Sequence, residues 1–247
     1  MIKTILIDAD VVAFRFAAAH EDVTQWTDDV WTSSANLTEA HAEAVRFCEK
    51  VRDEVGATDM VLLFSGSDSY RKDVFPKYKS NRKGKRRPLI LKQLRDALLE
   101  RPDAYLAEHG IEADDMLGLL GYRNLENVIA TIDKDLKTVE CNFYNWDYPD
   151  DGVILTDAKA AATQFYTQVL TGDSVDGYPG CPGVGPKTAE KLLAGAESAE
   201  EMWDIVVATY AKKKLTEDDA IVQARMAYIL KAPGDYCPAK GVTLWTP

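Results

Sequence analysis

Acidic side chains gather in four short clusters along this 247-residue chain, each where an apolar, strand-like run ends or a helix-like run begins. Like charges at close range repel and raise one another's pKa, so many carboxylates share a pocket only where cations hold them. Carboxylate oxygens without nitrogen or sulfur ligands favour hard cations such as Mg²⁺ or Mn²⁺. The sequence therefore predicts a metal site formed by Asp8, Glu112, Asp114, Asp115, Asp133, Asp135, Asp173 and Asp176.

No single cluster carries this prediction. Asp133 and Asp135 alone also fit a pair of surface acids, and Asp114 and Asp115 alone fit the positive end of a helix. Four clusters together favour metal binding, because two hard cations about 3.5–4 Å apart can stabilise both the attacking and the leaving oxygen of a phosphodiester.

A basic segment lies between the first two acid clusters, although the whole chain has a net charge of −11. Residues 71–95 hold eleven Lys or Arg and one acid, which gives this segment +10 and leaves −21 for the rest. Such asymmetry indicates a local site for a polyanion, the alternative being a solvated charged loop. Tyr78 stands among these cations, where an aromatic ring can stack on an unpaired base unless it is an ordinary half-buried tyrosine.

A glycine turn, Gly183-Val-Gly185-Pro-Lys187, follows the last acid cluster. Pro186 separates the glycine from the lysine, so the string is neither a P-loop nor a dinucleotide-binding glycine pattern. A Gly-Val-Gly turn before a helix instead fits a helix–hairpin–helix motif, whose backbone N–H groups hold a duplex phosphate without reading bases. The alternative is a tight turn between two packed helices.

The composition is ordinary for a globular protein, with 46% apolar and 28% charged residues. No apolar run approaches the roughly 18 residues of a membrane helix, and the N-terminus meets an acid too early for a signal peptide. Four scattered cysteines and three histidines form no zinc pattern. We therefore expect a reduced, cytoplasmic protein.

Strand-like and helix-like runs alternate through the first 155 residues. We expect strands at 3–7, 60–64, 104–106 and 127–132, weaker strands at 143–144 and 153–155, and helices at 36–55, 88–100, 113–122 and beyond 156 except 177–186. This order predicts an α/β fold with a mainly parallel central sheet flanked by helices, whose ligands bind beyond the carboxyl ends of the strands. The expected division is an α/β core over 1–155, including the basic segment at about 71–100, and a helical region over 156–247 packed on it.

These strings together resemble the 5′-nuclease superfamily of flap endonucleases and the 5′→3′ exonuclease domains of bacterial DNA polymerases. The chain looks closest to the compact exonucleases of bacteriophages. The resemblance covers about residues 1–195 and is carried by residues 5–8, 78–82, 110–115, 131–135, 172–176 and 183–185. It implies a PIN-like 5′-nuclease core with a helical arch, a C-terminal helix–hairpin–helix region, two Mg²⁺ or Mn²⁺ ions, and a K⁺ ion at the glycine turn.

The resemblance also assigns roles to residues. Asp8, Glu112, Asp114 and Asp115 would serve the first metal, and Asp133, Asp135, Asp173 and Asp176 would complete the second; Lys79 and Arg82 would be catalytic cations at the foot of the arch. Together with the charge pattern, it implies DNA contacts by Arg71, Lys72, Tyr78, Lys83, Lys85, Arg86, Arg87, Gly183, Gly185 and Lys187. The family has an acid after its second strand, but Asp68 lies closer to Arg71 than expected, so whether it faces the metals stays open.

The expected function is a metal-dependent 5′→3′ exonuclease with flap and structure-specific endonuclease capacity. Its substrate would be DNA with 5′ ends, nicks or flaps, with RNA·DNA hybrids as an extension. Two alternatives stay open: a DNA-structure-binding protein without catalysis, which the full acid set disfavours, and a PIN-type ribonuclease, which the glycine turn disfavours. We expect a monomer without membrane contact, in the host cytoplasm if phage-encoded. Residues after 195 receive no function.

Overall fold

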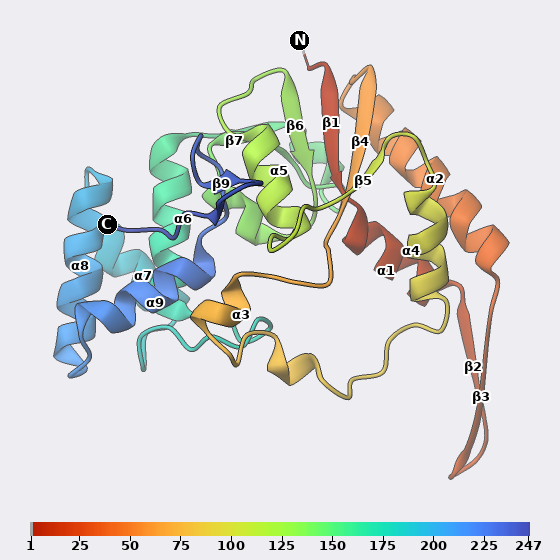
Figure 1. The fold of residues 1–247 in the computed structure, drawn as a ribbon, viewed down its shortest axis with the longest axis horizontal. Helices are drawn as coiled ribbons and strands as arrows, with labels where there is room; N and C mark the ends of the chain where they lie inside the picture. The colour runs from red at the N-terminus through yellow and green to blue at the C-terminus, as the bar shows by residue number, and fades with distance from the viewer. Residues whose placement is uncertain (1) are drawn as a thin grey trace.

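The computed structural model describes residues 2–247, and its centre is a six-stranded sheet in the order β5-β4-β1-β6-β7-β8 (Figure 1). All neighbours in this sheet pair in parallel except β7 and β8, which are antiparallel. The predicted mainly parallel sheet is therefore confirmed. Its strands are β1 (Thr4–Asp8), β4 (Asp59–Phe64), β5 (Ala104–Leu106), β6 (Asn127–Ala130), β7 (Cys141–Tyr144) and β8 (Ile154–Thr156).

Helices cover both faces of the sheet, which is why its central strands are almost continuous apolar runs. Ile5 and Ile7 point into a core formed with three helices, and Leu6 and Ile129 point into a second core against α5 (Ala113–Gly121). The helices of the first face are α1 (Ala9–Ala19), α2 (Leu37–Glu54) and α4 (Leu91–Leu99).

Helix starts follow local capping chemistry. Asn36 accepts the backbone N–H of Glu39 and begins α2 as expected. Asp8 ends β1 and at once caps α1 by accepting the Val11 N–H, so strand and helix follow without a loop. The expected start of a helix at Pro88 is wrong: a turn places Pro88 before α4, which begins at Leu91 after the buried Ile90.

The basic segment is a series of short helical pieces and turns rather than a continuous helical arch. α3 (Arg71–Val74) and a 3₁₀ turn, η1 (Ser80–Arg82), form its first part, and no helix occurs over 83–90 before α4. In Figure 1 this span passes beneath the carboxyl ends of the strands. The arch that the resemblance implies therefore has helix only at its two ends.

A second sheet, not foreseen from the sequence, is the hairpin of β2 (Glu21–Thr27) and β3 (Val30–Ala35), which projects from the body (Figure 1). The helical region has its own core, built from α6 (Ala158–Thr171), α7 (Pro186–Leu193), α8 (Ala199–Lys212) and α9 (Glu217–Ala227). After α9 the expected helix is replaced by a short hairpin of β9 (Tyr236–Cys237) and β10 (Gly241–Val242). Within 2–247, no helix is long and apolar enough to cross a membrane.

Candidate active site

The acid clusters meet at the carboxyl edge of the sheet. The Thr131 hydroxyl donates to Asp8 at 2.9 Å and accepts the Asp133 N–H at 3.0 Å, so this one buried side chain joins the ends of β1 and β6. Asp114 is brought to the same place by the first turn of α5. The topology thus gathers acids that are more than a hundred residues apart in the sequence.

Four of these acids, which we call the open acids, form no ion pair within 4 Å among residues 2–247: Asp8, Asp114, Asp133 and Asp135. Burial, followed by the negative charge of Asp10, raises the pKa of Asp8 to about 7. Burial and then Asp133 raise the pKa of Asp135 to about 7. Burial and then Asp8 raise the pKa of Asp114 well above its ordinary value, and burial likewise raises that of Asp133. The open acids are therefore short of positive charge.

Three further acids, the paired acids Glu112, Asp115 and Asp176, are held by cations. Lys79 Nζ lies 2.6 Å from Glu112 Oε1, and Arg82 Nη2 lies 2.6 Å from Asp176 Oδ1. Burial alone raises the pKa of Glu112, but the charges of Arg71 and Lys79 outweigh it and lower the pKa to about 2. Lys79 and Arg82 thus lie beside the acid pocket, and their catalytic role stays a prediction.

Arg71 is buried and organises this pocket through its hydrogen bonds, so its side chain is not available to contact DNA. Its guanidinium contacts Asp115 through two 2.8 Å hydrogen bonds and Glu112 at 3.1 Å. Its other donors bind the carbonyls of Met226 and Tyr228, so all five N–H groups are used inside the protein. The predicted DNA contact by Arg71 is wrong, because the side chain is buried under the segment that follows α9.

Asp115 is also committed to the fold. It is fully buried, and besides Arg71 it accepts the backbone N–H groups of Glu112 and Leu230. Its expected place among the metal ligands is not supported, because protein donors occupy both oxygens.

One more sequence-based expectation, for Tyr78, needs correction, and the structure also places Asp68, whose role was left open. Tyr78 is only 5% exposed and its hydroxyl donates to Glu112 at 2.8 Å, so the ring cannot stack on an unpaired base. The Asp68 side chain is 56% exposed and lies 3.7 Å from His109 Nδ1, and it forms no hydrogen bond or ion pair with an acid-pocket side chain among residues 2–247. Asp10 lies beside Asp8 instead, and accepts hydrogen bonds from Ser65 N–H and Arg95.

Asp173 and Asp176 belong to a loop that closes back on itself. Asp173 accepts the backbone N–H of Val175 at 2.6 Å and of Asp176 at 3.2 Å. Gly172 and Gly180 touch so closely that a Cβ on either would collide with backbone of the other. This contact fixes both acids at the pocket, where their charges help raise the pKa of Asp133, after burial as the larger cause.

The acid pocket is not a finished coordination shell. Among residues 2–247, no group of three or more His, Cys, Asp or Glu side chains has its ligand atoms placed to hold a metal ion as they stand. Lys79 and Arg82 hold Glu112 and Asp176, and Gln168 donates to Asp135. Side-chain rotation away from these partners is required before the acids could share a cation.

The glycine turn presents free backbone donors. The N–H groups of Gly183, Gly185 and Lys187 donate to no acceptor in the part of the chain that the structure describes. Gly183 needs its left-handed φ of 76°, whereas a Cβ on Gly185, at φ −99°, would meet nothing within 4 Å. The turn therefore offers unpaired backbone donors at the start of α7, and Lys213 Nζ lies 3.5 Å from where a Cβ on Gly183 would stand, an arrangement that suits a bound phosphate.

Fewer Lys and Arg side chains are free to bind a polyanion than the net charge of +10 over residues 71–95 suggests. Six of the eleven cations over 71–95 pair with acids within 4 Å, namely Arg71, Lys79, Arg82, Arg86, Lys92 and Arg95. Five remain unpaired with acids among residues 2–247: Lys72, Lys77, Lys83, Lys85 and Arg87. Of the expected DNA contacts, Lys72, Lys83, Lys85, Arg87 and Lys187 are exposed, whereas Arg86 binds the hairpin.

Sequence reasoning overlooked two polar residues that support the open acids. Thr131 joins Asp8 to Asp133, and Gln168 reaches Asp135 from α6 while its own Oε1 stays buried without a partner. Thr131 stands two residues before Asp133, a spacing that could have suggested it. No sequence pattern marks Gln168, because its role depends on how α6 packs.

The open acids lie beside paired cations at the carboxyl edge of a mainly parallel sheet, the edge at which such sheets bind their ligands. The model of the 5′-3′ exonuclease N-terminal resolvase-like domain matches residues 3–166, and that of the 5′-3′ exonuclease C-terminal SAM fold matches residues 162–232. The chain therefore belongs to the 5′-3′ exonuclease family.

Individual relatives agree with this assignment. The chain is 28% identical to the exodeoxyribonuclease of Enterobacteria phage T3, over 98% of this chain and 92% of the relative. The exonuclease of Escherichia phage T7 is also 28% identical, over 98% and 93%. In fold, the chain matches a bacteriophage T5 flap endonuclease solved with DNA and metal ions, with a TM-score of 0.66, 13% identity, and coverage of 92% and 89%. The predicted family and enzyme class, a 5′→3′ exonuclease of flap endonuclease type, are confirmed.

Proposed function

We propose that this chain hydrolyses DNA phosphodiesters from 5′ ends and at flaps with the help of divalent cations. The observation that carries the proposal is the group of open acids at the carboxyl edge of the sheet, none of which pairs with a cation within 4 Å among residues 2–247. Their oxygens are the donors that Mg²⁺ and Mn²⁺ prefer. The proposed ligands are Asp8, Glu112, Asp114, Asp133, Asp135, Asp173 and Asp176, with Asp115 as their support.

The bound cations would supply the charge that stabilises attacking and leaving oxygens. The chain's own contribution is positioning. Lys79 and Arg82, now on Glu112 and Asp176, lie where they can turn toward a phosphate and neutralise the charge that develops during cleavage. We assign them the catalytic cation role that the sequence predicts.

Duplex DNA would be held away from the pocket. The free N–H groups at Gly183, Gly185 and Lys187 suit one phosphate of a duplex, and the T5 flap endonuclease structure contains DNA.

Several finer points stay predictions: two ions of Mg²⁺ or Mn²⁺, K⁺ at the glycine turn, cleavage of RNA·DNA hybrids, a monomeric state, a cytoplasmic location, and the boundary between residues 155 and 156.

A cleavage assay tests the proposal. Flapped, nicked and RNA·DNA substrates labelled at the 5′ end should release short labelled products with Mg²⁺, and none in excess EDTA. Asp8→Asn should abolish this activity, whereas Asp68→Asn, a matched change outside the pocket, should keep it. Full activity in excess EDTA would contradict the proposed metal-dependent mechanism.

A further inference from the structure

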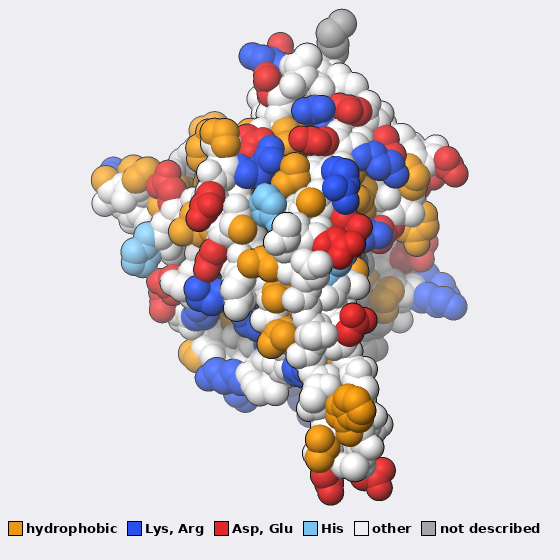
Figure 2. Space-filling view, turned by 90° about the vertical axis from the view of Figure 1, so that its right-hand side faces the viewer, with side chains coloured by type: hydrophobic (Ala, Val, Ile, Leu, Met, Phe, Trp, Pro, Cys, Tyr) orange, Lys and Arg blue, Asp and Glu red, His pale blue; other side chains and the backbone are white. Residues whose placement is uncertain are grey.

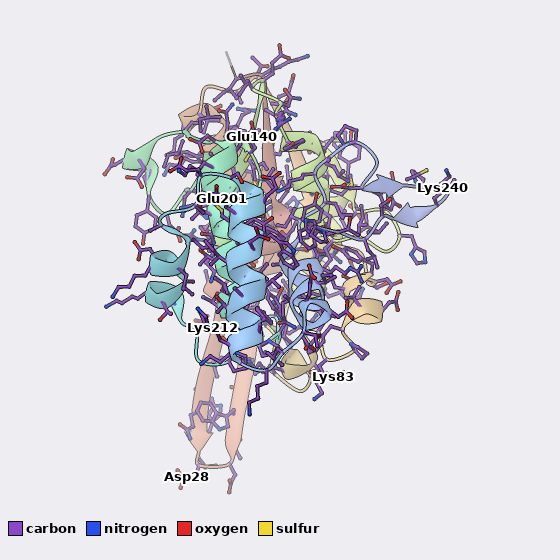
Figure 3. All side chains as sticks on the ribbon, turned by 90° about the vertical axis from the view of Figure 1, so that its left-hand side faces the viewer. Asp28, Lys83, Glu140, Glu201, Lys212 and Lys240 are labelled. Atoms are coloured by element: carbon purple, nitrogen blue, oxygen red, sulfur yellow. The ribbon has the colours of Figure 1, made fainter. Side chains whose placement is uncertain are left out.

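The projecting hairpin exposes large apolar side chains that no core explains. Trp26 is 67% and Trp31 is 56% exposed, and Val23 and Val30 are about half exposed. The ribbon extends well past the body, with Asp28 at its far end (Figure 3), and hydrophobic side chains are visible on it in Figure 2. Exposed aromatic clusters of this kind mark interaction sites.

The two faces of the hairpin differ. Cross-strand partners lie on one face, so the pairs Val23–Ser33 and Gln25–Trp31 place Trp31 on a first face with Glu21. Trp26 lies on the second face, where its indole N–H donates to Thr32 at 2.9 Å. The hairpin therefore carries one tryptophan on each side.

Charge separates these faces further. Arg86 of the basic span binds Glu21 and donates to Ser33 at 2.9 Å, which ties the span to the first face. Glu21 is thereby neutralised, and its side chain is only 6% exposed. The remaining acids of the hairpin lie on the second face or at the tip: Asp22, Asp28 and Asp29.

The first face thus has no free negative charge, and the segment that Arg86 ties to it carries unpaired cations. Lys83, Lys85 and Arg87 flank Arg86 along the chain, and all three are exposed with no acid within 4 Å among residues 2–247. An aromatic ring next to cations is the arrangement that binds a single strand, with the ring on a base and the cations on phosphates.

We propose that the first face of the hairpin extends the DNA-contact segment expected over residues 83–87, with Trp31 stacked on a base of the substrate's unpaired 5′ arm. Lys83, Lys85 and Arg87 hold the phosphates of that arm, and Arg86 fixes the span to the hairpin. This inference rests on the proposed function and names the part of the substrate that the hairpin contacts. The second face, with Trp26 and Asp22, does not contact it.

The matched pair of tryptophans gives the test. Kd is measured, with Ca²⁺ in place of Mg²⁺, for a nicked duplex carrying an unpaired 5′ arm and for the same duplex without the arm. Trp31→Ala should weaken binding of the armed DNA about 5- to 100-fold relative to the armless DNA, the range for loss of one base–aromatic stack. Trp26→Ala should leave the ratio of the two Kd values unchanged, and Trp31→Phe should restore most of it.

A charge experiment supports the same reading independently. Replacing Lys83, Lys85 and Arg87 with Gln should flatten the salt dependence for the armed DNA by about 0.7 per lost contact with the single strand. Equal losses in both tryptophan variants, equal losses on both substrates, or no loss in Trp31→Ala would overturn the site. Cleavage of the armless nick by the wild-type protein reports separately on the proposed function.

Discussion

The open acids and the paired acids share one pocket, yet the pKa of Glu112 and the pKa of Asp8 shift in opposite directions although both carboxylates are buried. Around Glu112, Arg71 and Lys79 outweigh burial and lower the pKa to about 2. Around Asp8 no cation pairs with the carboxylate, and burial raises the pKa to about 7. The comparison indicates that the paired acids already have their cations within the protein and form a stable scaffold. The open acids need positive charge from outside the chain. We call these two sets the paired half and the open half of the pocket.

The largest expected effect comes from the open half. Asp8→Asn and Asp133→Asn should each lower single-turnover cleavage by roughly 10²- to 10³-fold or more, the scale for removing an electrostatic stabiliser. Neither should destabilise the fold, because each removes a carboxylate charge that no cation pairs with and keeps an oxygen to accept the same hydrogen bonds. Denaturant unfolding beside the kinetics checks both claims. Near wild-type rates would remove these acids from the ligand set.

The paired half should respond in stability instead. Asp115→Asn leaves Arg71 buried without its two-bond partner, so the free energy of unfolding should fall by about 3–5 kcal/mol. Asp103→Asn, which breaks an ion pair with Arg101 that is about a quarter exposed, is the control and should cost far less. Similar losses in both variants, measured by denaturant titration, would mean that the buried pair is not a scaffold.

Lys79 and Arg82, the cations of the paired acids Glu112 and Asp176, should show a smaller, kinetic effect. Each change to Ala should lower turnover at saturating DNA by about 10- to 100-fold and change Kd much less, because the cations act on charge that develops in the transition state. Single-turnover rates and Kd values on one flapped substrate give the split. An effect confined to Kd would make these cations electrostatic contacts only.

The two halves should also titrate with opposite signs. Asp8 and Asp135 bind protons more tightly folded than unfolded, so without metal the fold should lose stability as pH rises from about 4 to 7. Glu112 has a lowered pKa, so its contribution is present above about pH 4.5 and lost as pH falls toward 2. Melting temperatures without metal should therefore be highest near pH 4 to 5. A flat profile from pH 4 to 7 would contradict the charge shortage.

The acid pocket could be predicted from the sequence, because the order of strands and helices alone brings the acids to one edge of the sheet. Apolar runs ending in Asp8 and before Asp133 must form neighbouring strands of a parallel sheet, whose carboxyl ends meet at one edge. The sequence could not predict that Arg71 and Tyr78 are buried. Arg71 finds partners 155 residues away at Met226, in a segment without any pattern that marks a contact.

Two further features could not be predicted from the sequence: how much of the basic segment's charge is free, and the hairpin of β2 and β3. The net charge of +10 over residues 71–95 does not show that Arg86 and Arg95 form ion pairs with acids of the hairpin and of α1. The hairpin escaped prediction because its strands face solvent on both sides, so no apolar alternation distinguishes a buried face.

The central claim, that the open acids bind the divalent cations, is tested most directly by calorimetric titration of the DNA-free protein with Mn²⁺ near pH 7. The wild-type protein and Asp68→Asn should bind Mn²⁺ with the same affinity and release protons, because Asp8 and Asp135 have pKa values of about 7. Asp8→Asn and Asp133→Asn should bind far more weakly and release fewer protons. Unchanged Mn²⁺ affinity in both of these variants would contradict the account.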